Sequence, residues 1–110
     1  MLLRYNADIN AQDITGGTPL HVAANNGMVD TARSLLDNGA NLKARTKKQS
    51  TPLHSASNLG MMEVARLLLE RGVDVDAEDD EGGTAYQIAL RGGFDEFAHL
   101  LSRHSIENKA

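Results

Sequence analysis

The sequence contains no cysteine and no tryptophan, and only two phenylalanines and two tyrosines among its 110 residues. The absence of cysteine excludes disulfide bonds and cysteine-ligated zinc sites. Because aromatic residues are so few, we expect a hydrophobic core of Leu, Ala, Val and Met, which an apolar fraction of 41% allows. The length is that of a single domain.

Long apolar runs and excess positive charge are also missing. No stretch approaches the roughly 20 apolar residues that a transmembrane helix needs. The first three residues are followed at once by Arg4 and Asn6, which argues against a signal peptide. A net charge of −4 argues against the basic face that nucleic-acid binding requires. We therefore expect no nucleic-acid or membrane partner, and a location inside the cell, in the cytoplasm or nucleus.

What the sequence does contain is a period of 33 residues. The tetrapeptide Thr-Pro-Leu-His occurs at residues 18–21 and 51–54, and the variant Thr-Ala-Tyr-Gln follows at 84–87. Further columns keep this register: Gly27, Gly60 and Gly93; Ala23, Ala56 and Ala89; Ala32, Ala65 and Ala98; Leu35, Leu68 and Leu101. A fixed period of this size indicates stacked repeats, each of which buries its apolar face against the next.

The tetrapeptides, the period and the turns at residues 38–42 and 71–75 resemble the ankyrin repeat family, from about residue 2 to about residue 106. The resemblance implies an all-α repeat solenoid of helix-turn-helix units joined by short β-hairpin or turn loops. We expect about three full repeats after an N-terminal partial one. The predicted divisions are a partial repeat at 1–12, repeats at 13–45 and 46–78, a C-terminal capping repeat at 79–104 and a tail at 105–110.

Local signals place two short helices in each repeat. Thr18 suits an N-cap and Pro19 a first helical residue, which predicts a helix to about Asn26. A second helix is predicted from residue 29 to residue 37, and the next repeat predicts helices at 51–58 and 61–70. Helices of two to three turns are marginal in water, so each must be stabilised by its neighbours.

The third repeat replaces apolar or turn residues with Asp95, Ser102 and Ser105. A terminal repeat needs a polar outer face because that face meets water. We therefore interpret residues 84–104 as a cap and the remainder as a frayed tail. The N-terminal end carries no such substitutions, so the leading face of residues 18–37 is predicted to be exposed or covered by a partner.

The histidines of the tetrapeptides, His21 and His54, are the main candidates for chemistry. As metal ligands they would lie roughly 10 Å apart in a stack of helices, too far to share one ion at about 2 Å ligand distances. The resemblance implies instead a structural role, in which each histidine bonds the loop of the adjacent repeat. We predict no catalytic residue, no cofactor and no metal. The resemblance also makes Asn10 a candidate for asparagine hydroxylation.

In ankyrin proteins the loop tips and the exposed side of each first helix line a concave binding face, which the resemblance carries over by register. The second tip is basic, the third is acidic, and the first offers an apolar residue, so a partner of opposite charge order is favoured. The predicted partner-binding residues are Ile14, Thr15, Asn25, Asn26, Lys47, Lys48, Ser50, Asn58, Leu59, Asp80, Glu81 and Arg91.

The leading functional hypothesis is a non-catalytic protein–protein interaction module or scaffold, not an enzyme. The alternative is structural assembly, either as a fragment of a longer array or by self-association through the uncapped N-terminal face. A monomer is expected under the first hypothesis. The sequence does not name the partner.

Overall fold

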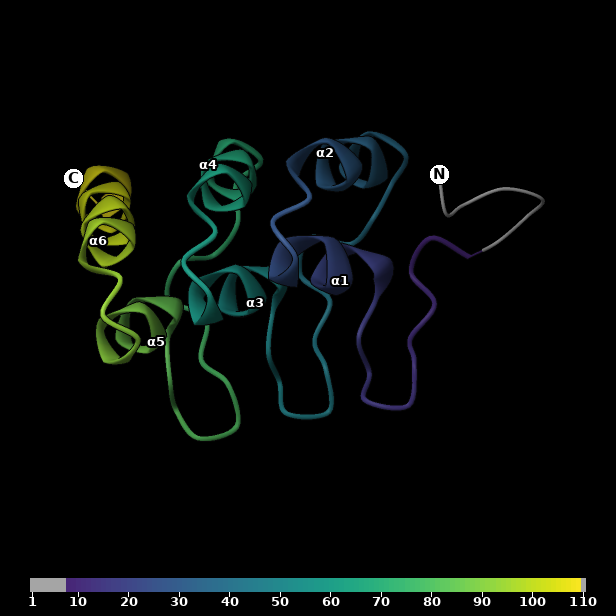
Figure 1. Ribbon diagram of the computed structural model, residues 1–110, viewed down its shortest axis with the longest axis horizontal. Coiled ribbons are helices and arrows are strands. Elements are labelled where there is room, and N and C mark those ends of the chain that lie inside the picture. The colour runs from purple at the N-terminus through teal and green to yellow at the C-terminus, as the bar shows by residue number, and fades with distance from the viewer. Residues whose placement is uncertain (1–7, 110) are drawn as a thin grey trace.

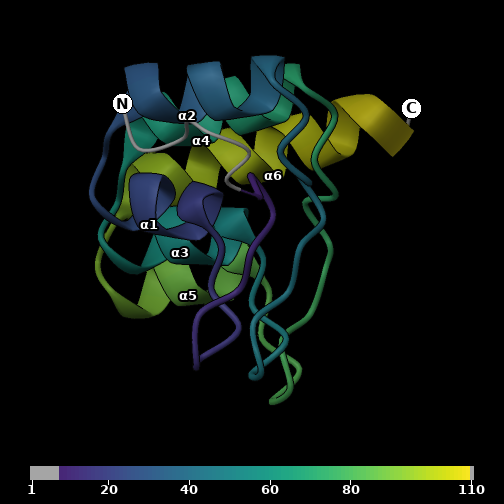
Figure 2. The same ribbon diagram turned by 90° about the vertical axis from the view of Figure 1, so that its right-hand side faces the viewer.

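The computed structural model describes the backbone of residues 8–109 and the side chains of residues 8–104. Across this range the chain forms six helices and no strand. They lie in two rows, α1, α3 and α5 in one and α2, α4 and α6 in the other, with three loops extending away from both (Figures 1 and 2). The helices are α1 (Pro19–Asn25), α2 (Val29–Asp37), α3 (Pro52–Asn58), α4 (Met62–Glu70), α5 (Ala85–Arg91) and α6 (Asp95–Lys109).

The inner helices α1, α3 and α5 begin in the same way. Thr18, Thr51 and Thr84 are N-caps with extended backbones, and each forms a capping box with the residue three positions later. Proline occupies the start of α1 and α3, where its missing N–H removes no helical hydrogen bond. The helix start predicted at Pro19 is thereby confirmed, and the helices predicted from residues 51 and 61 each begin one residue later.

The outer helices α2 and α4 are amphipathic. In α4, Val64, Ala65 and Leu68 are completely buried. Glu63 and Arg66 on its opposite side are exposed and lie 3.8 Å apart as an i,i+3 ion pair. Burial of one stripe against the neighbouring repeat stabilises a helix of only nine residues.

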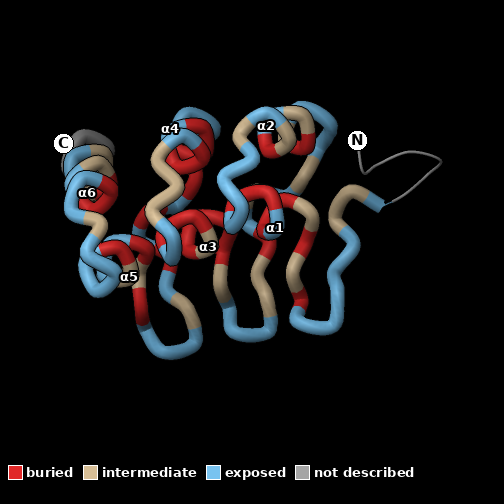
Figure 3. Tube along the Cα trace, in the orientation of Figure 1, coloured by how far each residue is buried: buried red, intermediate tan, exposed pale blue. Residues whose placement is uncertain are grey.

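The core runs between the two rows of helices, as the buried segments in Figure 3 show. Its largest fully buried side chain is Phe97 of α6. The prediction of a core without aromatics was therefore wrong on this point. Methionine contributes less than expected, because Met61 and Met62 are half-buried and Met28 is 43% exposed. Phe97 occupies the repeat position at which the earlier repeats have Thr31 and Val64.

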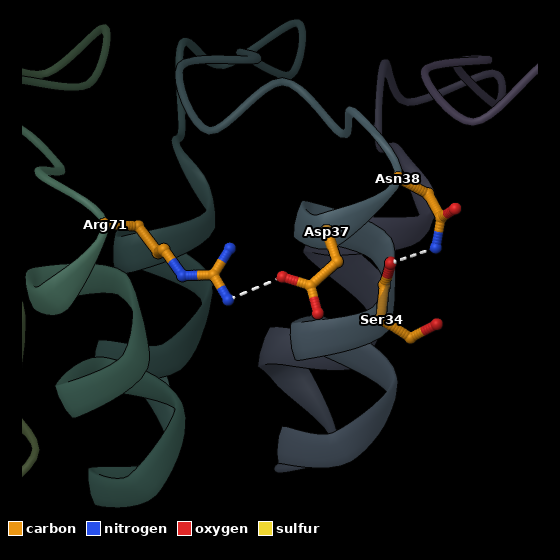
Figure 4. Close-up of polar contacts among 4 residues, drawn as sticks. All are labelled: Ser34, Asp37, Asn38 and Arg71. Carbon is orange, nitrogen blue, oxygen red and sulfur yellow. Dashed lines mark hydrogen bonds and ion pairs between the residues drawn. The ribbon is translucent and has the colours of Figure 1, made fainter.

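One ion pair links the ends of neighbouring outer helices. Arg71, the C-cap of α4, donates from Nη2 to Oδ1 of Asp37, the last residue of α2, over 2.7 Å (Figure 4). Beside it, the Asn38 side-chain amide donates to the Ser34 carbonyl over 2.7 Å and closes the end of α2. The ion pair joins the first two repeats at the ends of their outer helices, while the amide bond stays within the first repeat.

The loops are turns, one of the two forms that the resemblance implied, and no β-strand occurs in the described chain. Within the first loop, the Asp13 N–H donates to the Gly17 carbonyl over 2.9 Å. The C-terminal end differs from the expectation. The tail predicted from residue 105 is instead the last part of α6, which continues to Lys109. Ser105 stands where Gly39 and Gly72 adopt positive φ and end the preceding outer helices, so no glycine ends α6 there.

The partial repeat predicted at 1–12 lies mostly outside the described residues, which begin at Asp8. Of its described part, Ile9 is half-buried against a cluster that includes Leu20 and Leu35. The repeat boundaries drawn from the sequence remain predictions.

Candidate protein-binding surface

The histidine of each tetrapeptide joins its own helix cap to the next loop. The Nδ1 atom of His21 accepts a hydrogen bond from the Thr18 backbone N–H at 3.1 Å. Its Nε2 atom lies 2.9 Å from the Ser50 carbonyl, 29 residues on. The ring accepts a hydrogen bond at Nδ1 and must donate one to the carbonyl at Nε2. It is therefore neutral and carries its proton on Nε2. His21 therefore acts as a brace between consecutive repeats.

His54 repeats this arrangement one step along the stack. Its Nδ1 accepts from the Thr51 N–H at 3.0 Å, and its Nε2 lies 2.9 Å from the Gly83 carbonyl. The ring is only 1% exposed. The structural role predicted for both histidines agrees with these contacts, and no cluster of three potential metal-ligating side chains occurs among the residues described.

Burial lowers the pKa of His21 below its ordinary value, because desolvation disfavours the charged ring. The bond to the Ser50 carbonyl opposes this shift. The neutral form is therefore the one that the fold selects.

Each loop is closed internally by one short polar side chain at the same repeat position. The Asp13 carboxylate accepts from the N–H groups of Thr15 and Gly17 at 2.8 and 2.9 Å, and from the Thr15 hydroxyl at 2.6 Å. The Thr15 bond is the main cause that lowers the pKa of Asp13. In the third loop Asp79 accepts from the Gly83 and Glu81 N–H groups at 2.8 and 2.9 Å.

The bond from Gly83 is the main reason that the pKa of Asp79 is also lowered. In the second loop Thr46 takes the place of the aspartates, and its hydroxyl accepts from the Lys48 and Ser50 N–H groups, both at 3.2 Å. Gln49 in this loop has φ of 64°, where the other two loops use glycine. The basic loop therefore holds backbone strain that its neighbours avoid, a property that is common at functional sites.

Hydrogen bonds between neighbouring loops hold the three tips in one row. Lys47 N–H donates to the Thr15 carbonyl, and Asp80 N–H donates to the Lys48 carbonyl, each over 2.9 Å. We call this row, residues 13–17, 46–50 and 79–83, the tip ridge. Its order along the stack is one apolar, one basic and one acidic tip.

Two side chains that the sequence analysis missed brace the ridge further. The Gln12 side-chain amide donates to the Arg45 carbonyl over 3.1 Å, and Arg45 Nη1 donates to the Glu78 carbonyl over 2.8 Å. These residues share one column of the 33-residue period. A polar column of donor side chains was therefore the signal that could have identified them.

The structure places all of the predicted binding residues on the tip ridge or on the inner helices and their ends. Eleven of the twelve are exposed, and Ser50 is half-buried beneath the histidine bond. The apolar members Ile14 and Leu59 are 88% and 51% exposed. Val22, which was not predicted, adds 45% exposed apolar surface on α1.

Four predicted residues meet around one groove between the second and third repeats, with a volume of about 460 Å³. Asp79 and Ile88, which sequence reasoning missed, also line it. Ile88 shares a column with Val22, so an apolar residue at this position of an inner helix was the available signal. The remaining predicted residues lie outside this groove. The lining consists of Ser50, Asn58, Asp79, Glu81, Ile88, Arg91 and Gly92.

Asn10 contributes to the first inter-repeat contact instead of standing free. Its Oδ1 accepts from the Asn41 N–H at 2.7 Å, and its Nδ2 donates to the Gly39 carbonyl at 3.4 Å. Its hydroxylation stays a prediction. No helix in the described range has the length and apolar character to cross a membrane.

Two curated proteins are similar to part of this chain. Protein phosphatase 1 regulatory subunit 27 of Mus musculus is 48% identical over 44 residues, which cover 40% of this chain and 29% of the relative. Its Homo sapiens counterpart is 46% identical over the same length and shares. The chain thus spans less than a third of the curated relatives that it matches.

The family model for ankyrin repeats in three copies matches residues 1–79 and 46–110. The two matched ranges together include the entire sequence, and the stacked helix pairs have the architecture that the resemblance predicted. A protein-binding role is what this repeat architecture implies. The chain belongs to the ankyrin repeat family.

Proposed function

We propose that this chain is a non-catalytic binding module that holds a protein partner against the tip ridge and the exposed side of α1, α3 and α5. The observation that carries the proposal is the row of hydrogen bonds between neighbouring loops. These bonds fix the backbones of the three tips, while the side chains at the centre of each tip stay exposed. A rigid display surface loses little conformational entropy on binding.

The order of side chains along the ridge supports a particular partner chemistry. Ile14 is followed by Lys47 and Lys48, and then by Asp80 and Glu81. Packed helices space the repeats by about 10 Å, and an extended chain rises about 3.3 Å per residue. An extended segment with an acidic residue opposite the second tip and a basic residue about three positions away, opposite the third, fits this order.

The groove between the second and third repeats supports a polar anchor for such a segment. Asn58 and Arg91 offer N–H donors, Glu81 offers a carboxylate, and Ile88 supplies apolar surface. A volume of about 460 Å³ is large enough to hold one or two partner side chains.

The regulatory subunit named among the relatives also supports binding without catalysis. The matched stretch of 44 residues is little longer than one 33-residue repeat. We therefore take from it the role of the repeat and not the identity of the partner.

A peptide-display selection tests the proposal. The chain is immobilised, and a library of extended peptides is selected at low and at physiological ionic strength. We expect enrichment of segments in which an acidic and a basic residue are separated by about three positions. Exchanging the charges, by Lys47→Glu with Lys48→Glu and by Asp80→Lys with Glu81→Lys, should reverse the preferred order.

The matched control exchanges charges on the opposite side of the molecule. Glu63→Arg with Arg66→Glu inverts an exposed pair on α4 and should leave the selected peptides unchanged. If the ridge variants select the same peptides as the control, or if raised salt leaves the association rate unchanged, the charged tips do not contribute to partner recognition.

A further inference from the structure

Consecutive repeats of this chain interlock through a bulky side chain and a glycine. Met61, the N-cap residue of α4, packs on Gly27, where an added methyl group would lie 2.8 Å from the Met61 sulfur. Phe94 occupies the same position of the third repeat and packs on Gly60, where the methyl group would lie 2.6 Å from the ring. Each glycine thus forms a hole for the side chain of the following repeat.

At the two ends of the stack, one glycine of this column and one bulky side chain have no partner from a neighbouring repeat among the described residues. Gly93 is the third glycine of this column, and a methyl group there would meet nothing within 4 Å. Met28 is the first member of the bulky column, and its side chain is 43% exposed.

Two apolar side chains of α5 are exposed in the repeat that the sequence predicted to be a polar cap. Tyr86 and Leu90 of α5 are 39% and 45% exposed. Their counterparts one repeat earlier, Leu53 and Ser57, are at most 1% exposed. The polar substitutions are confined to α6, where Asp95 is exposed and Ser102 half-buried. We call Tyr86, Leu90 and Gly93 the trailing face.

A donor on α5 also matches the inter-repeat ladder. Gln87 caps α5 through its side-chain oxygen, which accepts from the Thr84 N–H at 3.1 Å, as Nδ1 of His54 does in α3. By the same register, its amide nitrogen corresponds to Nε2, the atom by which each histidine contacts the next loop. In the column of Ser50 and Gly83, the acceptor one repeat earlier is the Gly17 carbonyl.

We propose that the trailing face of one copy docks on the first repeat of a second copy, with Met28 seated on Gly93 and Gln87 donating to the Gly17 carbonyl. The occupant follows from continuity with the two interfaces inside the chain, since each trailing surface is covered by the leading surface of a repeat. The contact is heterologous and therefore extends into open chains of copies instead of closing as a dimer.

One feature weakens the contact relative to the internal interfaces. Glu78 ends the column in which Gln12 and Arg45 donate to the next loop, and a carboxylate cannot donate. We therefore expect association only at high concentration.

Sedimentation equilibrium over micromolar to millimolar concentrations tests the proposal. The mean mass of the intact chain should rise with concentration without a plateau at the dimer. Met28→Glu and Leu90→Glu should each abolish the rise, with Tyr86→Ser as a milder change on the trailing face. Leu59→Glu, at an exposed position outside this contact, is the matched control and should associate like the parent chain, provided that circular dichroism shows each variant folded.

Mixing the two single variants separates head-to-tail docking from other pairings. The Leu90→Glu copy retains an intact first repeat, and the Met28→Glu copy retains an intact trailing face. An equimolar mixture should form one-to-one dimers and nothing larger. A parent chain that stays monomeric, a Met28→Glu copy that still dimerises through paired trailing faces, or a mixture that stays monomeric overturns the proposal. None of these results bears on peptide binding at the tip ridge.

Discussion

Replacing Gly60 with alanine tests how much of the stability depends on close contact between repeats. Gly60 has φ of 66°, and a methyl group there would lie 2.6 Å from Cδ1 of Phe94. The ring cannot simply move away, because a methyl group at Gly92 would also lie only 2.9 Å from its opposite edge. Phe94 is therefore held between two glycine backbones.

The expected loss has two parts. A left-handed backbone costs alanine about 1–2 kcal/mol, and overpacking against Phe94 adds about 1–3 kcal/mol. Gly93→Ala provides the matched control, since its φ is 80° and nothing lies within 4 Å of the added methyl group. Both variants reduce the entropy of the unfolded chain alike, so the difference between them isolates the contact with Phe94.

Urea unfolding followed by circular dichroism measures both free energies of unfolding. We expect Gly60→Ala to lose about 1–3 kcal/mol more than Gly93→Ala. In a Phe94→Ala background this excess should disappear, which a double-mutant cycle detects. Equal losses in the two glycine variants, or an excess that survives removal of the ring, would refute the reasoning.

Three further predictions concern stability. Leu68→Ala, at a fully buried position, should lower the free energy of unfolding by about 2–5 kcal/mol in urea titrations. Because the pKa of His21 is lowered in the folded state, the unfolded chain binds the His21 proton at higher pH than the folded chain does. The contribution of neutral His21 to stability is therefore complete above the ordinary pKa of 6.5 and is lost as the pH falls through the folded pKa. In His21→Gln, the free energy of unfolding should depend less on pH. Gln49→Gly removes the strain of a positive φ and should raise stability by up to about 1 kcal/mol, visible as a higher melting temperature.

The repeat register, the helix pairs and their starts could be predicted from the sequence because they depend on local chemistry. A threonine followed by proline begins an inner helix wherever it occurs, as at Thr18 and Thr51, since the cap and the fixed proline φ act within one turn. The positions of exposed residues on the tips followed from the same register. The sequence therefore predicts which residues lie on the candidate binding surface. It does not predict which of them line the same groove.

Contacts between residues one repeat apart were decided by the tertiary structure. The 33-residue period shows that Gln12 and Arg45 occupy equivalent positions, but only stacking brings the amide of one to the carbonyl of the other. The same holds for Phe97, which is buried in one cluster with Val64 and Leu68 of the preceding repeat. Composition alone had suggested a core without aromatics.

The ends of the stack show most clearly what the sequence decides and what the tertiary structure decides. The sequence by itself determined that each repeat carries an apolar face, because Leu and Ala columns recur at a constant spacing. It did not determine which side chains of the third repeat stay exposed, since Tyr86 and Leu90 occupy positions that are buried in earlier repeats. Burial is a property of the neighbour as much as of the residue, so only the assembled structure decided which apolar side chains face water.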